Sequence, residues 1–380
     1  MREESERLSH DYAILSQKLL QLAPQAGLYE SLIPGLSFAR RDDPERRENV
    51  LFPPCVGIVV QGSKQATIGT KELCYRRGQY ILCCVDMPSA FIVSGSSEEP
   101  YLTVSFRLDF PLLAEIFREL DSHYINKAMA LDDALGSGAG RSADAETPED
   151  VLDGEPADAD FADEELAGED TFDEDREKDA PAFDDDADAD ECGEEMQCGL
   201  DSSLFHGSVE CAMHVCEITP EMLNAFLRLI YLLDKDSDEV RAIAPLIVRE
   251  IHYYLATGPN GRLLRTFLMT RTQSWQIVRA IAHMRRHCSE RLPIESLARL
   301  VHMAESTFNR NFKRVTTLSP LQYHKHLKLF EARRLMKQKG MNAATACAAV
   351  GYESQQQFTR EYKRLFGCPP MRDTRRNHHQ

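Results

Sequence analysis

The sequence predicts an α+β protein with a strand-rich N-terminal half and an all-α C-terminal domain. Short apolar runs separated by glycines and prolines fill residues 36–108, which is typical of a small barrel or sandwich. A long acidic segment follows. Beyond it the apolar residues adopt helical spacing, and a pattern of helix, tight turn and helix occurs twice between residues 294 and 366.

Residues 1–34 form the first predicted unit, an N-terminal helical arm. Apolar residues recur there on one helix face, which ends near Pro24: Leu8, Tyr12, Leu15, Leu19 and Leu20. We expect this helix to dock on the next domain. Residues 1–9 are rich in Glu and Arg, and no apolar run approaches the ~20 residues that cross a bilayer, so we expect no membrane segment.

Residues 35–131 form the second unit, a barrel with room for one small ligand. The predicted strands are Cys55–Val60, Gln65–Ile68, Glu72–Tyr75, Tyr80–Val85, Phe91–Val93 and Tyr101–Leu108, with turns at Gly62, Gly69, Gly78, Pro88 and Gly95. A helix from Asp109 to Leu120 is expected to close the barrel.

Residues 132–206 are predicted to be a disordered acidic insertion. Residues 141–195 hold 26 Asp and Glu against three Lys and Arg, a local charge of -23, whereas the whole chain carries -17. Such a segment buries too few apolar side chains to offset the entropy of ordering. It is either a solvated spacer or an acidic strip that competes with DNA or binds a partner through Phe161, Phe172 and Phe183.

Soft metal ligands are frequent near the end of the insertion: Cys192, Cys198, His206, Cys211, His214 and Cys216. Their spacings match no common zinc pattern, and residues 206–217 also alternate like a strand, so we predict no metal site and no cofactor. The eleven cysteines, an odd number spread along the chain, indicate a reducing cytoplasm.

Residues 207–270 form the next predicted unit, a helical segment. Glu221–Leu233 and Glu239–Thr257 are amphipathic helices that stop at the breaker Gly258-Pro259-Asn260-Gly261, and Arg262–Met269 is a short helix. The apolar stripe is either a homodimer contact or only intramolecular core.

Residues 271–380 form the predicted DNA-binding domain, which carries a net charge of +14. It begins with a helix at Trp275–His287. The first helix of the first helix-turn-helix unit has Pro293 in its first turn and an apolar face formed by Ile294, Leu297, Ala298 and Val301. A turn follows at residues 302–304. The second helix has Phe308, Phe312 and Val315 on its inward face. Its outward residues are Ser306, Thr307, Asn309, Arg310, Lys313 and Arg314.

The second unit repeats the design, with a helix at Ala343–Val350, a turn at Gly351, and a helix from Ser354, its N-cap, to Phe366. Phe358, Tyr362 and Leu365 face inward. The outward residues are Ser354, Gln355, Gln356, Gln357, Thr359, Arg360, Lys363 and Arg364. Arg, Asn and Gln suit base edges, and Ser, Thr and Lys suit phosphates, so both faces match DNA; the alternative is an ordinary polar helix surface.

The run Gly-Tyr-Glu-Ser-x-x-x-Phe-x-Arg-x-Tyr-Lys-Arg-x-Phe-Gly-x-Pro, Gly351 to Pro369, resembles the C-terminal signature of the AraC/XylS family of transcription regulators. Further matches are Ala298, Met303, Phe308, Arg310, Phe312, Lys313, Ser319, Pro320 and Tyr323. This sequence departs from the family pattern at four positions. Ala304 replaces the Ser that usually caps the recognition helix, Lys328 replaces the Arg of the linker helix, and Ala346 and Cys347 replace the usual Ile and Ala. These departures affect which DNA sequence the protein is expected to prefer, and not whether it binds DNA.

The N-terminal half resembles the AraC-type N-terminal domain, a cupin-like β-barrel. The resemblance rests on Leu36-Ser37-Phe38, on Val56–Gly62, on Tyr75 with Gly78 and Tyr80, and on Pro100–Asp109. Glu250–Pro259 resembles the family's dimer segment, which implies a dimerisation role for the helical segment at residues 207–270. Metal-dependent cupins bind their metal through clustered histidines, and this chain has no His between His10 and His123. We therefore do not expect a cupin oxygenase.

The resemblance implies a cytoplasmic, sequence-specific DNA-binding regulator, an activator, that responds to a small effector through its barrel. Expected partners are double-stranded promoter DNA, RNA polymerase and a second copy of the chain. No nucleophile elbow or phosphate-binding glycine loop occurs, and no enzyme activity is expected. The alternatives are a bifunctional barrel enzyme fused to a DNA-binding domain and an effector-independent DNA-binding protein.

Four cysteines of the predicted barrel are weak candidates for an effector or redox site: Cys55, Cys74, Cys83 and Cys84. They are either small buried hydrophobes or thiols that react with an electrophile. A reactive thiol needs a depressed pKa, and no His and few cations lie near them in sequence. We therefore favour a non-covalent organic effector, such as a carbonyl compound.

Overall fold

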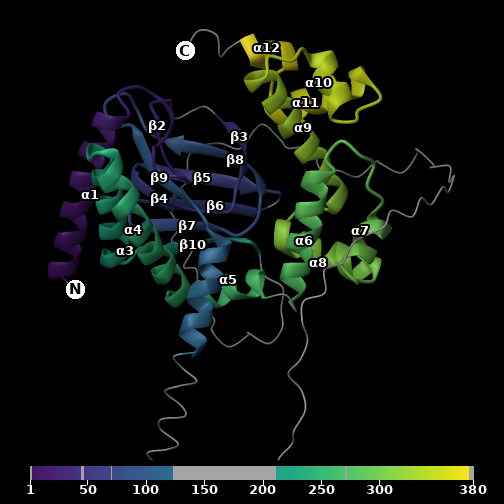
Figure 1. The fold of residues 1–380 in the computed structure, drawn as a ribbon. Coiled ribbons are helices and arrows are strands. Elements are labelled where there is room, and N and C mark those ends of the chain that lie inside the picture. The colour runs from purple at the N-terminus through teal and green to yellow at the C-terminus, as the bar shows by residue number, and fades with distance from the viewer. Residues whose placement is uncertain (1, 44–46, 70, 123–210, 270–271, 376–380) are drawn as a thin grey trace, which may run out of the picture. The chain divides into compact units, whose positions relative to one another are not determined.

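The computed structural model describes residues 2–43, 47–69, 71–122, 211–269 and 272–375 (Figure 1). The insertion predicted at 132–206, with Cys192, Cys198 and His206, lies outside these residues. In the described parts, no helix combines the length and the hydrophobicity of a membrane span.

Helix α1 (Arg2–Leu22) packs on the N-terminal sheets and on helix α3 (Pro220–Tyr231). Tyr12 and Leu15, at most 2% exposed, lie on its buried face, as the helical spacing predicts. Lys18 Nζ lies 2.6 Å from a carboxylate oxygen of Asp234, which follows α3. The expectation that the N-terminal helix docks on its neighbours is therefore confirmed.

The described strands form two antiparallel sheets. The six-stranded sheet has the order β1 (Gly27–Glu30), β2 (Leu36–Arg41), β9 (Tyr101–Arg107), β4 (Cys55–Gln61), β7 (Gln79–Cys83) and β10 (Met213–Glu217). The four-stranded sheet has the order β3 (Glu48–Phe52), β8 (Met87–Ser94), β5 (Ser63–Ile68) and β6 (Lys71–Arg76).

The α+β class is confirmed, but the predicted closure into a barrel is not. Among the described residues, the outermost strands of each sheet have a hydrogen-bonded neighbour on one side only, so both sheets are open. Closure would require pairing between β1 or β10 and the other sheet. Such non-local pairings leave no local sequence signal, whereas the strands themselves do.

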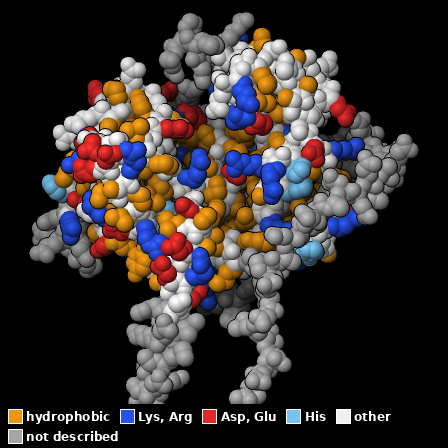
Figure 2. Space-filling view, in the orientation of Figure 1, with side chains coloured by type: hydrophobic (Ala, Val, Ile, Leu, Met, Phe, Trp, Pro, Cys, Tyr) orange, Lys and Arg blue, Asp and Glu red, His pale blue; other side chains and the backbone are white. Residues whose placement is uncertain are grey.

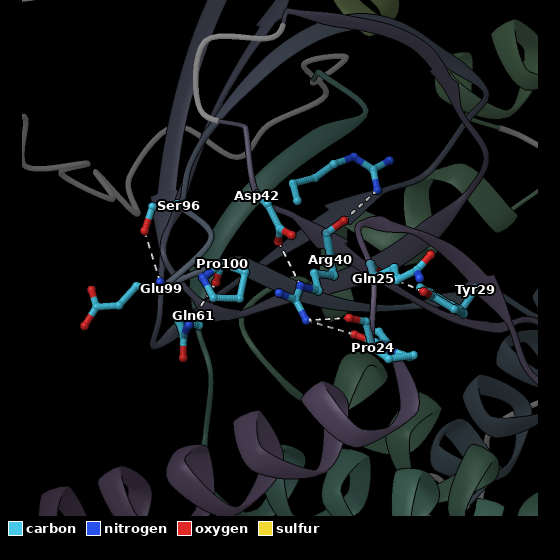
Figure 3. Close-up of polar contacts among 11 residues, drawn as sticks. Pro24, Gln25, Tyr29, Arg40, Asp42, Gln61, Ser96, Glu99 and Pro100 are labelled. Atoms are coloured by element: carbon cyan, nitrogen blue, oxygen red, sulfur yellow. Dashed lines mark hydrogen bonds and ion pairs between the residues drawn. The ribbon is translucent and has the colours of Figure 1, made fainter. Parts of the chain in front are cut away.

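Three hydrogen bonds at one end of the six-stranded sheet fix the chain around β2 and β4 (Figure 3). Arg40 donates from Nε to Asp42 Oδ1 over 2.8 Å and from an Nη to the Pro24 carbonyl over 3.0 Å, which holds the end of α1 against β2. Gln61 Nε2 donates to the Pro100 carbonyl over 2.9 Å. The bonds to Pro24 and Pro100 satisfy backbone carbonyls in the loops that precede β1 and β9.

The helices beside the sheets match the expected segment. Residues 110–122 are helical, and α3 is followed by α4 (Ser237–Thr257) and α5 (Gly261–Leu268). Thr219 and Asp236 cap α3 and α4 by accepting backbone N–H bonds. The buried His252 accepts from the Asp109 amide at 2.9 Å, joining α4 to the end of β9.

The C-terminal residues form seven helices in the described range 272–375: α6 (Gln273–Arg286), α7 (Ile294–Leu300), α8 (Glu305–Thr316), α9 (Pro320–Gln338), α10 (Ala343–Ala349), α11 (Gln355–Phe366) and α12 (Pro370–Arg375). The two predicted helix-turn-helix units are α7–α8 and α10–α11. The connecting helix α9 begins at a capping box formed by Ser319 and Gln322.

Candidate nucleic-acid interface

Helix α8 presents a polar face because its apolar side is completely buried. Phe308, Phe312 and Val315 are each 0% exposed, as predicted. Of the six predicted DNA-contacting residues, four are exposed and two half-buried. The exposed ones are Ser306, Arg310, Lys313 and Arg314, and the half-buried ones are Thr307 and Asn309.

Helix α11 has the same construction. Phe358 and Tyr362 are 0% exposed, whereas Leu365 is only half-buried. Seven of its eight predicted contacts are exposed: Ser354, Gln355, Gln356, Gln357, Arg360, Lys363 and Arg364. The eighth, Thr359, is half-buried, and its hydroxyl donates to the Gln355 carbonyl over 2.8 Å.

Superposing the two helices by their buried aromatic residues reveals a repeated set of cations. With Phe308 aligned to Phe358, three pairs of identical residues coincide: Arg310 with Arg360, Lys313 with Lys363, and Arg314 with Arg364. Positions i, i+3 and i+4 lie on one face of a helix. Each second helix therefore carries the same three positive charges on its exposed side.

These six cations have no carboxylate partner among the described residues, whereas several other basic side chains of the domain are paired, as in Arg299 with Glu295 at 2.6 Å and Arg334 with Glu331 at 2.6 Å. In Figure 2, Lys and Arg side chains gather over α6, α8 and α9. Unpaired cations on an exposed helix face are available to phosphate oxygens and to base edges.

The turns of both units have the same backbone conformation. After α7 the chain passes through His302 at φ 53, and after α10 through Gly351 at φ 73. The next amide then bonds back to the helix: Met303 N donates to the Ala298 carbonyl over 2.9 Å, and Tyr352 N to that of Cys347 over 3.1 Å. This is the Schellman arrangement, which ends a helix and sets the direction of the next.

The N-termini of the two recognition helices are capped differently. Ser354 Oγ accepts from the Gln357 amide over 3.3 Å, which confirms the predicted cap of α11. Ala304 stands at the same position of α8 and makes no side-chain cap bond. The first amides of α8 thus lack the oxygen that Ser would supply.

Helix α9 connects the two units through contacts at its middle. Lys328 Nζ donates to the Gly351 carbonyl over 3.4 Å, and His324 Nε2 lies 3.1 Å from the Cys288 carbonyl. Gly351 packs so closely on the segment before α7 that a Cβ there would lie 1.8 Å from the Ser289 carbonyl oxygen. The turn of the second unit therefore contacts the first unit directly.

A buried carboxylate joins α9, α11 and α12. Asp373, 6% exposed, accepts from Arg333 Nε at 2.7 Å and from the Tyr362 hydroxyl at 2.8 Å, and lies 3.2 Å from Lys337 Nζ. These partners hold the pKa of Asp373 below its usual value despite burial. The spacing of apolar residues gave no indication of this contact.

The four candidate cysteines do not form one site. Cys55, Cys83 and Cys84 are buried, and Cys74 is exposed. Burial raises the pKa of Cys55 to about 12 and raises those of Cys83 and Cys84 as well, the reverse of what a reactive thiolate needs.

The cysteines and histidine after the insertion are used in local contacts. His214 Nε2 lies 2.7 Å from the Cys211 carbonyl, and Asn260 Nδ2 lies 2.9 Å from Cys216 Sγ. Within the parts of the chain that the structure describes, no group of three or more His, Cys, Asp or Glu side chains is placed to hold a metal ion.

One residue that sequence reasoning missed is Lys64. The predicted strand began at Gln65, whereas β5 begins at Ser63, and Lys64, Ala66 and Ile68 alternate on its buried face. Extending the alternation one residue toward the N-terminus would have placed this lysine in the core.

Comparison with known proteins identifies the same two halves. A family described as AraC-type transcriptional regulator N-terminus matches residues 32–153 and 191–263, just over half of the chain, and a helix-turn-helix domain family matches residues 297–376.

Curated relatives align with about a third of the chain. The HTH-type regulator YobQ of Bacillus subtilis is 32% identical over 114 residues, 30% of this chain and 47% of YobQ. The regulator ExsA of Pseudomonas aeruginosa is 27% identical over 130 residues, 34% of this chain and 46% of ExsA. The chain thus spans less than half of the length of each of these relatives.

Solved structures show low sequence identity. The apo ToxT variant from Vibrio cholerae is 7% identical, with a TM-score of 0.48 over 90% of this chain and 98% of ToxT. The DNA-binding domain of AdpA, solved with a target DNA, is 22% identical, with a TM-score of 0.27 over 27% of this chain and 94% of that domain. The family matches at both halves, together with the paired helix-turn-helix units, show that the chain belongs to the AraC/XylS family of transcription regulators.

Proposed function

We propose that the protein is a sequence-specific regulator that binds double-stranded promoter DNA through α8 and α11, and is not an enzyme. The observation that carries this proposal is the repeated triplet of unpaired cations, Arg310, Lys313 and Arg314 on α8 and their equivalents on α11. One such face is common on a helical protein. Two faces with the same three cations, each on the second helix of a helix-turn-helix unit, match two adjacent sites on one duplex.

The two helices are proposed to enter successive major grooves, roughly 10 bp apart. Arg310 and Arg360 are the candidates for bidentate bonds to guanine, and the neighbouring Lys and Ser residues for phosphate contacts. Gln355, Gln356 and Asn309 are candidates for adenine edges. The contact of Gly351 with the Ser289 carbonyl supports a fixed distance between the two subsites.

The N-terminal sheets are proposed to sense a small effector and α3–α4 to form a homodimer contact. Three large apolar side chains of α4 support the second point because they are exposed: Ile243 39%, Leu246 64% and Tyr253 46%. We further propose cytoplasmic activation through RNA polymerase. The relative RclR of Escherichia coli is named a transcriptional activator, and promoter DNA in bacteria is cytoplasmic.

The test is binding of the full-length protein to DNA fragments recovered by genomic footprinting. Arg310→Ala and Arg360→Ala are each expected to weaken specific binding by ~1–3 kcal/mol, roughly 5- to 150-fold. Arg334→Ala is the matched control, because Arg334 is paired with Glu331 on α9 and lies outside both recognition faces. Equal effects of all three substitutions would refute the proposal.

A further inference from the structure

Helix α11 carries a single acidic residue, Glu361, next to its predicted DNA-contacting residues. The Glu361 side chain is 18% exposed, and among the described residues it forms no ion pair with Arg360 or Arg364. A carboxylate near DNA repels the phosphates, so an acidic residue at this place weakens binding unless it has another role. The hydrogen bonds of Glu361 indicate what that role is.

Both carboxylate oxygens of Glu361 are bound by neighbouring side chains. The Tyr352 hydroxyl donates to Oε2 over 2.6 Å, and Gln357 Nε2 donates to Oε1 over 3.1 Å. On α9, Lys325 Nζ lies 4.0 Å from Oε1. Glu361 therefore connects α9 and the turn before α11 to one exposed side chain of the recognition helix, Gln357.

Tyr352 is itself held in place by the turn. Its amide donates to the Cys347 carbonyl over 3.1 Å, and its ring meets that of the buried Phe358 edge to face, with the centroids 5.4 Å apart. Burial, together with the neighbouring Glu361 charge, raises the pKa of the Tyr352 hydroxyl. The hydroxyl therefore keeps its proton and acts as the donor to Oε2.

The carboxylate fixes which end of the Gln357 amide faces it. A carboxylate accepts hydrogen bonds and has no proton to donate, so it binds the amide nitrogen and not Oε1. The second proton of Nε2 and the Oε1 atom remain unused among the described residues. One donor and one acceptor match the N7 acceptor and the N6 donor of adenine, whereas guanine presents two acceptors, N7 and O6.

Helix α8 lacks this arrangement. Asn311 stands where α11 has Glu361, three residues after the first buried Phe of each helix, and Thr307 stands where α11 has Gln357. Asn311 is 2% exposed, and its Nδ2 donates to Gln273 Oε1 on α6 over 3.1 Å. It therefore joins α8 to α6 inside the domain. The two recognition helices share their cations but not this contact.

We propose that Glu361 is a positioning residue for base recognition, which orients the Gln357 amide so that the second helix-turn-helix unit selects an adenine. The proposal rests on the DNA binding proposed above and adds a residue that touches no base itself. Ordering Gln357 before DNA arrives removes part of the rotamer entropy that a free glutamine loses on binding. The bonds of Glu361 to Tyr352 and Gln357 also hold its carboxylate away from the cations that face DNA.

The experiment measures base preference with the full-length protein. Each base pair of a footprinted site is changed in turn to the other three, and competition gel shifts give the relative affinities. Gln357→Ala identifies the base pair that Gln357 contacts, because the preference for adenine should disappear there and remain elsewhere. Glu361→Gln is the decisive variant, because it preserves the size of the side chain and can still bond to Tyr352.

The introduced amide reverses the polarity of the contact with Gln357. The Tyr352 hydroxyl donates to the new carbonyl oxygen, so the new NH2 group faces Gln357 and binds its Oε1. Gln357 then presents Nε2 to the base, and two donor protons suit the N7 and O6 acceptors of guanine. We expect the preference for adenine over guanine at that base pair to fall at least roughly fivefold, the lower end of what one bidentate contact contributes.

Glu353→Ala is the control for the lost charge. Glu353 is exposed in the turn before α11 and makes no hydrogen bond with Gln357 among the described residues. Its removal should change the affinity for all base pairs alike. The same uniform change with Glu361→Gln would show a purely electrostatic or structural role and would overturn the inference.

An adenine preference that survives Gln357→Ala, or one that survives Glu361→Gln, would also overturn this inference while leaving DNA binding intact. The failure of the proposed function has a different signature. A wild-type protein that binds no DNA sequence-specifically would overturn that function and this inference together.

Discussion

Gly351 is the residue whose replacement is expected to disturb the C-terminal domain most directly. It occupies the left-handed position of the second turn, at φ 73, and a Cβ there would lie 1.8 Å from the Ser289 carbonyl oxygen. The backbone of the first unit must therefore move if Gly351 is replaced. We expect Gly351→Ala to destabilise the C-terminal domain and to alter the spacing of the two recognition helices.

The magnitude follows from two costs. An L-residue in the left-handed region costs roughly 1–2 kcal/mol, and forcing packed backbone apart costs typically ~1–3 kcal/mol. Gly351→Ala should therefore lower the free energy of unfolding by about 2–5 kcal/mol. Binding to a two-subsite DNA should also fall by more than binding to either half-site alone.

His302 provides the matched control, since it occupies the equivalent turn position at φ 53 and is exposed. Replacing it with Gly removes the left-handed strain but adds chain entropy, so we expect His302→Gly to be neutral or to stabilise by up to about 1 kcal/mol. Urea unfolding of the full-length variants, followed by the fluorescence of Trp275, measures both. If Gly351→Ala were as stable as the wild type, the close contact with Ser289 would be refuted.

Two further predictions concern charge and pH. Deleting residues 141–195 should tighten DNA binding at low salt, because a segment of charge -23 tethered to a domain of charge +14 competes with the DNA phosphates for that domain. Gel-shift titrations of the deletion variant and the full chain should show that the difference in affinity vanishes at high salt. Equal affinities at low salt would leave the segment only a spacer role. Burial, aided by the Lys328 charge, lowers the pKa of His324 to about 4, below its value near 6.5 in the unfolded chain. The unfolded chain therefore binds this proton more readily than the folded protein does, and the free energy of unfolding should fall as the pH drops from about 6.5 to about 4. His324→Gln should reduce the slope of that part of a melting-temperature profile, to which the buried His326 contributes in the same direction, and an unchanged slope would contradict this assignment.

The helical half could be predicted closely because its signals are local. The spacing of Phe308 and Phe312, the turn at Gly351 and the cap at Ser354 each lie within a few residues of the feature they specify. The buried and exposed faces of both recognition helices follow from that spacing. Which exposed residues touch DNA stays a prediction.

The sheets were less predictable because their arrangement depends on distant partners. Each strand can be recognised from a local sequence pattern. No local pattern indicates that both sheets are open or that β10 pairs with β7. Lys64 was missed for a related reason. A lysine at the start of an alternating run is easily taken for a strand boundary, although the alternation of Ala66 and Ile68 extends to Lys64 and the rings of Phe52 and Phe91 pack around it.

The late arrival of β10 has a consequence for synthesis. β7 ends at Cys83, and its partner β10 begins about 130 residues later, at Met213. At roughly 5–20 residues per second, a ribosome needs about 7–25 s to bridge that interval. Throughout this time the edge formed by Tyr80, Ile81 and Leu82 has no β10 beside it, so the nascent protein exposes an apolar strand that is prone to pair with other chains until β10 is made.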